Sequence, residues 1–173
     1  MTAENYQKII SFLRATPLRE RLSKALVKHL PKLFFAVYAV ELFFLTVQFY
    51  HAGLAADQGI LLFGALLMPA LCLLTSTLLR KKLDHKRPYE VFPITPLIPK
   101  DTHGHSFPSN HTASAFVLAL TAFRLSFPLG IIMTVLAVIT GLSRIAAGLH
   151  WPKDVFFGAG IGLFFGILEL TLF

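Results

Sequence analysis

Long apolar segments separated by short polar ones make up most of this chain. Five of them approach the roughly 20 residues that a helix needs to cross a hydrocarbon core. They cover residues 33–50, 59–79, 108–127, 128–145 and 152–173. Because the bilayer interior offers the backbone no hydrogen-bond partners, each segment must be helical. The pattern therefore predicts an all-α integral membrane protein, with five transmembrane helices that form one bundle over residues 33–173.

Residues 1–32 follow a different pattern, with apolar and basic side chains on separate helical faces. Tyr6 and Ile10 share the apolar face of a first helix, and Pro17 begins a second helix with Thr16 as its N-cap. Such amphipathic helices lie in the membrane interface rather than cross it. The alternative is a solvated helix that packs on a partner. The segment lacks the apolar core and the cleavage site of a signal peptide.

Composition agrees with a membrane protein of one domain, residues 1–173. Hydrophobic residues make up 55% of the chain and charged residues 14%, whereas a soluble domain carries about 25% charged residues. The net charge of +7 suits anionic lipid as surroundings or substrate, and we expect membrane lipid, not nucleic acid, as the partner. The lone cysteine, Cys72, has apolar neighbours that favour a buried side chain over a reactive thiol. Glu41 and Glu169 lie in or beside spans, where we expect a packing or interfacial role.

The longest polar stretch, residues 80–107, separates the second and third predicted spans. Its first part, up to Arg87, is expected to continue the second helix until Pro88 stops it. Prolines then recur at every third position, which favours an extended, polyproline-like loop over the mouth of a site. These prolines are Pro93, Pro96 and Pro99.

The order of the spans brings three polar clusters to one membrane face. Residues 80–111 join the end of the second span to the start of the third. The third and fourth spans form a hairpin that returns residues 143–154 to the same face. Polar residues are costly near lipid, so their concentration on one face indicates a functional site.

The cluster Pro108-Ser109-Asn110-His111 opens the third predicted span. Pro108 suits the first position of a helix, which would place the next three residues in the first turn. Unpaired N–H groups there, together with the helix dipole, bind phosphate. Ser109 adds a hydroxyl group and His111 a titratable proton. The alternative is that Ser109 and Asn110 are ordinary capping residues.

The cluster with Arg144, His150 and Asp154 is more specific. Arg144 supplies a planar fork for phosphate oxygens. Asp154 follows His150 by four residues, so its carboxylate can reach one ring nitrogen and leave the other free as a nucleophile. The alternative is an Asp that caps a helix beside an interfacial His.

The remaining cluster is a basic run at the end of the second span. It contains Arg80, Lys81, Lys82, Lys86 and Arg87. Such runs usually face solvent or lipid head groups, but this one faces two clusters that contain His. We therefore expect it to contribute to phosphate binding.

These motifs resemble the three signature motifs of the type 2 phosphatidic acid phosphatases. The matching elements are Arg87-Pro88, Pro108-Ser109-Asn110-His111 and Ser143-Arg144 followed by His150 and Asp154. The resemblance implies a lipid phosphatase that needs no metal or other cofactor and works through a phosphohistidine. His150 would attack phosphorus, Asp154 would orient it, and His111 would protonate the leaving oxygen.

The resemblance also implies a set of phosphate-binding residues: Arg80, Lys81, Arg87, Ser109, Asn110 and Arg144. The family usually has Lys where this chain has Arg80, with Lys81 beside it, and often Gly where it has Asn110. We expect activity with altered geometry at the first position, and tolerance at the second because the backbone N–H remains. The family commonly has six spans, and here the interfacial segment 1–32 would replace the first.

Several functions remain open at this point. Lipid A 1-phosphate is the favoured substrate, with undecaprenyl diphosphate and phosphatidylglycerol phosphate as alternatives. Phosphotransfer to another lipid would share the same intermediate, and a non-catalytic lipid-phosphate binder or transporter is a further alternative. A metal-dependent hydrolase is the last, although no familiar ligand spacing occurs among its candidate ligands. Those candidates are Asp101, His103, His105, His111, His150 and Asp154.

The distribution of basic residues and the family resemblance predict opposite orientations in the membrane. All Lys and Arg residues except Arg124 fall on the predicted site face, and the positive-inside rule would place that face in the cytoplasm. The resemblance implies instead a bacterial inner membrane protein whose site faces the periplasm, and we expect this second arrangement.

Overall fold

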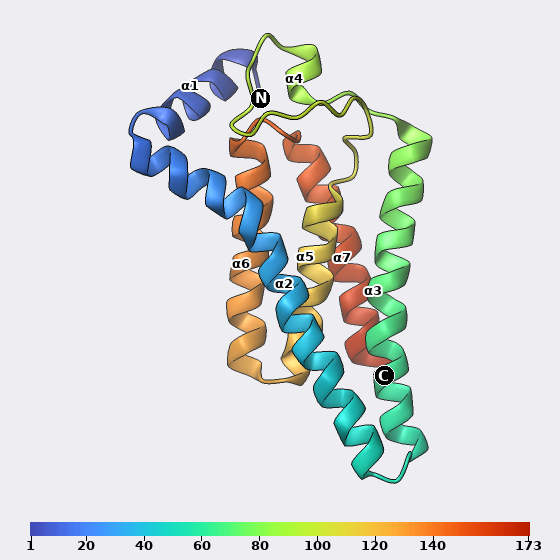
Figure 1. Ribbon diagram of the computed structural model, residues 1–173. Helices are drawn as coiled ribbons and strands as arrows, with labels where there is room; N and C mark the ends of the chain where they lie inside the picture. The colour runs from blue at the N-terminus through green and yellow to red at the C-terminus, as the bar shows by residue number, and fades with distance from the viewer.

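The computed structural model describes residues 1–173 and contains helices and their connections only (Figure 1). In chain order these are α1 (Ala3–Arg14), α2 (Pro17–His51), α3 (Ala56–Leu83), α4 (Pro88–Val91), α5 (Asn110–Thr121), a 3₁₀ turn (Ala122–Arg124), α6 (Phe127–Ala146) and α7 (Pro152–Leu172). Four of the helices, α2, α3, α6 and α7, are long and apolar enough to cross a membrane. The all-helical, multi-pass architecture is therefore confirmed.

The expected third span, residues 108–127, is shorter than predicted. α5 has twelve residues and ends in the 3₁₀ turn, so the count of five full spans is not confirmed. α5 contacts α2, α3, α6 and α7, and most of its side chains are buried. Protein rather than lipid covers this central helix, so it does not need the length of a lipid-facing span.

Glycines allow α7 to pack closely on α5. Gly158, Gly162 and Gly166 are buried at four-residue spacing, and a Cβ atom at Gly158 would lie 2.6 Å from the carbonyl oxygen of Ser109. Gly160 faces open space. Three of the four glycines thus let α7 approach α5 closely, and this contact holds the N-terminus of α5 beside that of α7.

The N-terminal segment differs from the prediction at residue 32. The second amphipathic helix and the first span are one continuous helix, α2, which passes through Pro31. α1 folds over the polar end of the bundle (Figure 1), where its predicted apolar face, with Tyr6 and Ile10, is buried against Ile94. The partner of this face is therefore the chain itself.

α3 also ends earlier than predicted, at Leu83 rather than Arg87. Asp84 has a φ angle of +39°, a left-handed conformation that a right-handed helix does not continue through. Its carboxylate accepts a hydrogen bond from the backbone N–H of His105 at 3.0 Å. The chain therefore turns at Asp84, and Arg87 lies just before α4 instead of on α3.

Candidate active site

The three polar clusters meet at one end of the bundle, as the order of the spans predicts (Figure 1). The N–H of Ser109 donates to the carbonyl oxygen of Asp154 at 2.9 Å. Nη1 of Arg87 donates to the carbonyl oxygen of Leu149 at 3.2 Å. These bonds tie the start of α5 to the first turn of α7, and the segment before α4 to the short connection between α6 and α7.

His150, in that connection, and Asp154, in the first turn of α7, form a buried pair. Pro152 is the first residue of α7, and Asp154 accepts a hydrogen bond from the N–H of Trp151 at 3.0 Å, a capping geometry that fixes its carboxylate. Oδ2 of Asp154 lies 3.4 Å from Nδ1 of His150, and the exposed fractions of the two side chains are 0% and 3%. The carboxylate of Asp154 therefore both caps α7 and faces the imidazole of His150. The two roles that the sequence offered as alternatives for Asp154 are compatible.

Ser106 contacts both residues of this pair, although the sequence pattern did not point to it. It is fully buried, and its hydroxyl group donates to Oδ2 of Asp154 and lies 3.5 Å from Nδ1 of His150. Its N–H donates to the carbonyl oxygen of His85 at 2.8 Å. A serine in a proline-rich loop carries no periodic signal, and only the fold of that loop brings it to Asp154.

Burial decides the charge of His150. Removal from water disfavours the imidazolium form and lowers the pKa of His150 to about 4, with Arg87 lowering it further and Asp154 acting in the opposite direction. The ring is therefore neutral at pH 7. With Nδ1 facing Asp154, Nε2 is the nitrogen left for nucleophilic chemistry.

Arg87 and Arg144 are both buried, with exposed fractions of 3% and 5%, and the charge of Arg144 acts on His111. Nε of Arg87 donates to the carbonyl oxygen of Gly104 at 3.2 Å, in addition to the bond from Nη1. Arg144 comes from the last turn of α6, and its Nη2 donates to the carbonyl oxygen of Val27 at 2.9 Å. Nε of Arg144 is buried without a partner, which leaves a donor available for an anion.

Arg80 and Lys81 differ in their contacts. Nε of Arg80 donates to the carbonyl oxygen of His105 at 2.8 Å, and its charge interacts with Arg87 and Asp154. Lys81 is exposed. Of the two residues, Arg80 is therefore the one that faces the candidate site.

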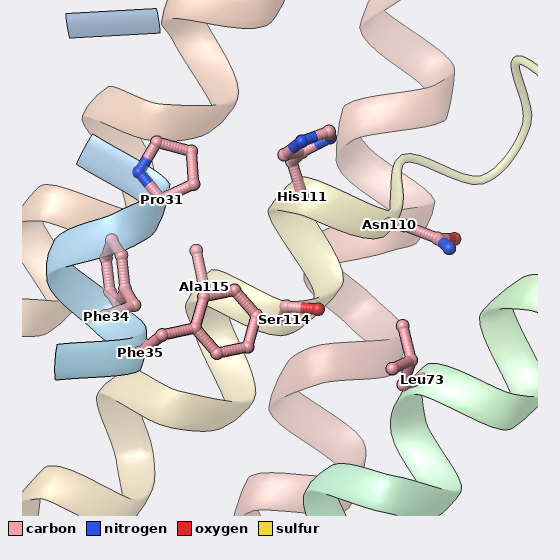
Figure 2. Close-up of a pocket in the computed structure, with 8 residues that line it drawn as sticks. All are labelled: Pro31, Phe34, Phe35, Leu73, Asn110, His111, Ser114 and Ala115. Carbon is pink, nitrogen blue, oxygen red and sulfur yellow. The ribbon is translucent and has the colours of Figure 1, made fainter. Parts of the chain in front are cut away.

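α5 starts two residues later than predicted, at Asn110 instead of Pro108. Ser109 is the N-cap, and Pro108 lies before the helix rather than at its first position. The hydroxyl group of Ser109 accepts a hydrogen bond from Thr112, at 3.0 Å. The side chain of Asn110 donates to Thr77 of α3, also at 3.0 Å. Figure 2 shows Asn110 and His111 projecting from the start of α5 in different directions.

Two cavities adjoin His111, and both are lined by Pro31 and Phe35 of α2. The larger, of about 520 Å³, is also lined by four basic side chains: Lys28, Lys32, Lys100 and Arg144. The smaller, of about 180 Å³ and shown in Figure 2, is lined mainly by apolar side chains of α2, α3 and α5. A polar cavity and an apolar one therefore meet at His111, which suits a molecule with an anionic head and a hydrocarbon part.

The ligands named for a metal-dependent site do not come together. No three His, Cys, Asp or Glu side chains group closely enough to hold a metal ion. His103 and His105 lie in the loop over the site and face Glu90 and Asp84, at 3.5 and 3.1 Å, whereas His150 faces Asp154.

Several known proteins that this chain resembles are phosphatases, and a family model matches most of the chain. The PAP2 superfamily model matches residues 60–173. The chain is 34% identical over 101 residues to the lipid A 1-phosphatase of Rhizobium johnstonii, which covers 54% of this chain and 38% of that protein. It is 30% identical over 82 residues to the undecaprenyl-diphosphatase BcrC of Bacillus subtilis, which covers 47% of this chain and 42% of that protein. The chain thus spans less than half the length of these curated relatives.

Solved structures show the same fold. The crystal structure of Aquifex aeolicus LpxE matches with a TM-score of 0.66 and 27% identity, over 95% of this chain and 93% of that one. A PAP2 type phosphatidylglycerolphosphate phosphatase from Bacillus subtilis matches with a TM-score of 0.58 and 21% identity, over 96% and 91%. The family match covers every motif residue from Arg80 to Asp154. This chain therefore belongs to the PAP2 superfamily.

Proposed function

We propose that this protein removes a phosphate group from a lipid head group by way of a phosphohistidine at His150. The observation that carries the proposal is the buried His150–Asp154 pair, on which the charge of Arg87 acts. Arg144 lines the cavity that reaches His111. The relatives named lipid A 1-phosphatase and undecaprenyl-diphosphatase support this class of reaction.

In the first half-reaction, Nε2 of neutral His150 attacks phosphorus while the bond between phosphorus and the lipid oxygen breaks. Asp154 stabilises the positive charge that develops on the ring. His111 gives a proton to the departing oxygen. In the second half-reaction, His111 takes a proton from water, the water oxygen attacks phosphorus, and the phosphorus–nitrogen bond breaks to restore His150.

Arginines and the start of α5 would hold the phosphoryl oxygens. Arg87 and Arg144 supply guanidinium donors, and Arg80 replaces the lysine that the family usually has. The N–H groups of Asn110 and His111 in the first turn of α5 have no partner within the helix. We therefore assign Asn110 a backbone role, since its side chain is bound to Thr77.

The favoured substrate is lipid A at its 1-phosphate. A cavity of about 520 Å³ lined by four basic residues exceeds what one phosphate group needs, so it suits a head group with further polar or anionic parts. Burial lowers the pKa of Lys100, and the nearby Arg87, Arg144 and Arg80 lower it further, which reflects a concentrated positive field. Undecaprenyl diphosphate and phosphatidylglycerol phosphate remain the alternative substrates.

We place the site on the periplasmic face of a bacterial inner membrane, in line with the resemblance rather than with the count of basic residues. A Lys82→Cys variant tests this, because the native Cys72 is buried. Labelling of intact cells by a membrane-impermeant maleimide is expected, and labelling only after lysis would place the site in the cytoplasm.

The reaction is tested by phosphate release from a panel of lipid phosphates in detergent, with EDTA present. We expect turnover by the parent protein, none by His150→Ala, and parent-like turnover by the exposed-residue control His103→Ala. Loss of activity in EDTA would support the metal-dependent alternative. Binding of lipid phosphate without turnover would support the binder, and transfer of phosphate to an added lipid instead of to water would support the transferase.

A further inference from the structure

Two of the long helices contain an internal proline, and each proline leaves one backbone carbonyl without its helical partner. Pro31 lies in α2 and Pro69 in α3. Proline has no N–H and cannot bond the carbonyl oxygen four residues earlier. In α2 this carbonyl belongs to Val27, and in α3 it belongs to Ala65.

Each of these carbonyl oxygens accepts a hydrogen bond from a side chain of another helix. Nη2 of Arg144 donates to Val27 at 2.9 Å, and the hydroxyl group of Tyr38 donates to Ala65 at 2.8 Å. Val27 and Ala65 are buried, with exposed fractions of 3% and 0%. Since an unpaired carbonyl in such surroundings is costly, each proline creates an acceptor that a specific donor fills.

The acceptor made by Pro31 lies at the candidate site. Val27, Pro31, His111 and Arg144 all line the same cavity. The bond to Val27 holds one nitrogen of the Arg144 guanidinium, while its buried Nε has no partner. Because the guanidinium is planar and rigid, fixing one nitrogen also fixes the direction of the others.

We propose that Pro31 is a positioning residue: by withholding an N–H, it leaves the Val27 carbonyl free to hold Arg144 in the orientation that binds phosphate. This assignment rests on the proposed function of the site. It makes the N-terminal part of α2 a component of the phosphate site and not only a contact with the membrane interface.

Replacing Pro31 by Ala restores the missing N–H. That N–H can bond the Val27 carbonyl within the helix and competes there with Arg144, which weakens the bond that orients the guanidinium although no catalytic group is removed. Ala also favours the helix far more than Pro does. The variant is therefore expected to keep its melting temperature while binding phosphate and its analogues more weakly.

The experiment compares Pro31→Ala with Pro69→Ala. The second variant restores an N–H that can bond the Ala65 carbonyl, away from the site. The readouts are the dissociation constant of orthovanadate, the KM and kcat for the best lipid phosphate, and the melting temperature in detergent. We expect Pro31→Ala to weaken orthovanadate binding and raise KM about tenfold, in keeping with the loss of a hydrogen bond to a charged group. Pro69→Ala should leave both values unchanged.

A third variant separates the missing N–H from the shape of the proline ring. Lactic acid, the α-hydroxy acid analogue of alanine, introduced at position 31 places an ester oxygen where the N–H would be. It lacks both the ring and the donor, so it should restore the orthovanadate affinity of the parent protein.

Equal affinity in Pro31→Ala and the parent protein would overturn the assignment, as would equal weakening in Pro69→Ala or no orthovanadate binding by the parent. Weaker orthovanadate binding in Pro31→Ala by a protein that turns over no lipid phosphate would instead support the assignment and refute the proposed hydrolysis.

Discussion

Two buried clusters of charged residues lie at opposite ends of the bundle, and they differ in what their charges contact. At the polar end, Arg87 and Arg144 bind backbone carbonyl oxygens. At the other end, Arg124 donates to two oxygens of Glu169: a carboxylate oxygen, at 2.5 Å, and the backbone carbonyl oxygen, at 2.8 Å. Glu41 is fully buried near this ion pair.

The difference shows that buried charge alone does not identify a site. Both clusters contain unpaired buried acceptors, among them Oδ1 of Asp154 at the polar end, but only the polar end also has an unpaired buried donor, Nε of Arg144. The unpaired atoms of Glu41 and Glu169 are acceptors packed between helices, whereas Nε of Arg144 is a donor in a residue that lines a cavity. An anion needs donors and space, and the polar end provides both.

The largest expected effect comes from Asp154→Asn, which would break the polar cluster at its centre. The amide keeps the shape of the side chain but loses the negative charge that stabilises the imidazolium. We expect kcat to fall about 10⁴-fold, as for the corresponding change in a Ser-His-Asp triad. Steady-state phosphate release measures this, with Lys153→Ala as an exposed neighbouring control. A kcat within a few fold of the parent value would remove Asp154 from the mechanism.

Alanine substitutions of one arginine in each cluster should have opposite effects on stability and activity. Arg124→Ala leaves Glu169 buried and unpaired, which should reduce the free energy of unfolding by about 3–5 kcal/mol while the folded protein keeps its kcat/KM. Arg144→Ala should instead reduce kcat/KM at least 100-fold, with a smaller change in stability. Denaturant titration and kinetics on the same samples measure both quantities. The comparison fails if both variants lose mainly stability or both lose mainly activity.

Ser106→Ala removes one hydrogen bond from Asp154 and leaves the pair with His150 in place. Hydrogen bonds to charged groups contribute about 1.5–3 kcal/mol, so we expect kcat to fall about tenfold or somewhat more. Ser106→Thr keeps the hydroxyl group and should recover part of this loss. The pH profile of kcat tells a positioning role from a merely structural one, because only the first shifts the titration of His150.

The smallest expected effect is an absence of titration. Because burial lowers the pKa of His150 to about 4, its ring stays neutral as the pH falls from 8 to 5 and gains a proton only near pH 4. Nitrogen NMR of histidine-labelled protein, with His150→Ala to assign the signal, measures this midpoint. A midpoint near 6.5, the ordinary value for histidine, would mean that water reaches the ring.

Much of this molecule follows from sequence patterns that are local. The long apolar runs specify α2, α3, α6 and α7, since a hydrocarbon core fixes both the length and the helical form of a span. The four-residue spacing of His150 and Asp154 lets the carboxylate reach the imidazole, and the order of spans brings residues 80–111 and 143–154 to one face. The resemblance drawn from these motifs is confirmed by the family match.

The tertiary structure decided what depends on pairing between distant segments. Ser106 donates to Asp154, and Arg80 rather than Lys81 donates to the loop over the site. Arg144 donates to the carbonyl oxygen of Val27. Loop backbone and side-chain donors find one another only after the helices have packed, so no periodic pattern records these contacts. The local pattern of apolar and polar residues therefore specifies the four long spans, their order and the end of the bundle at which the polar clusters meet, whereas the contacts between particular donors and acceptors form only when the helices pack.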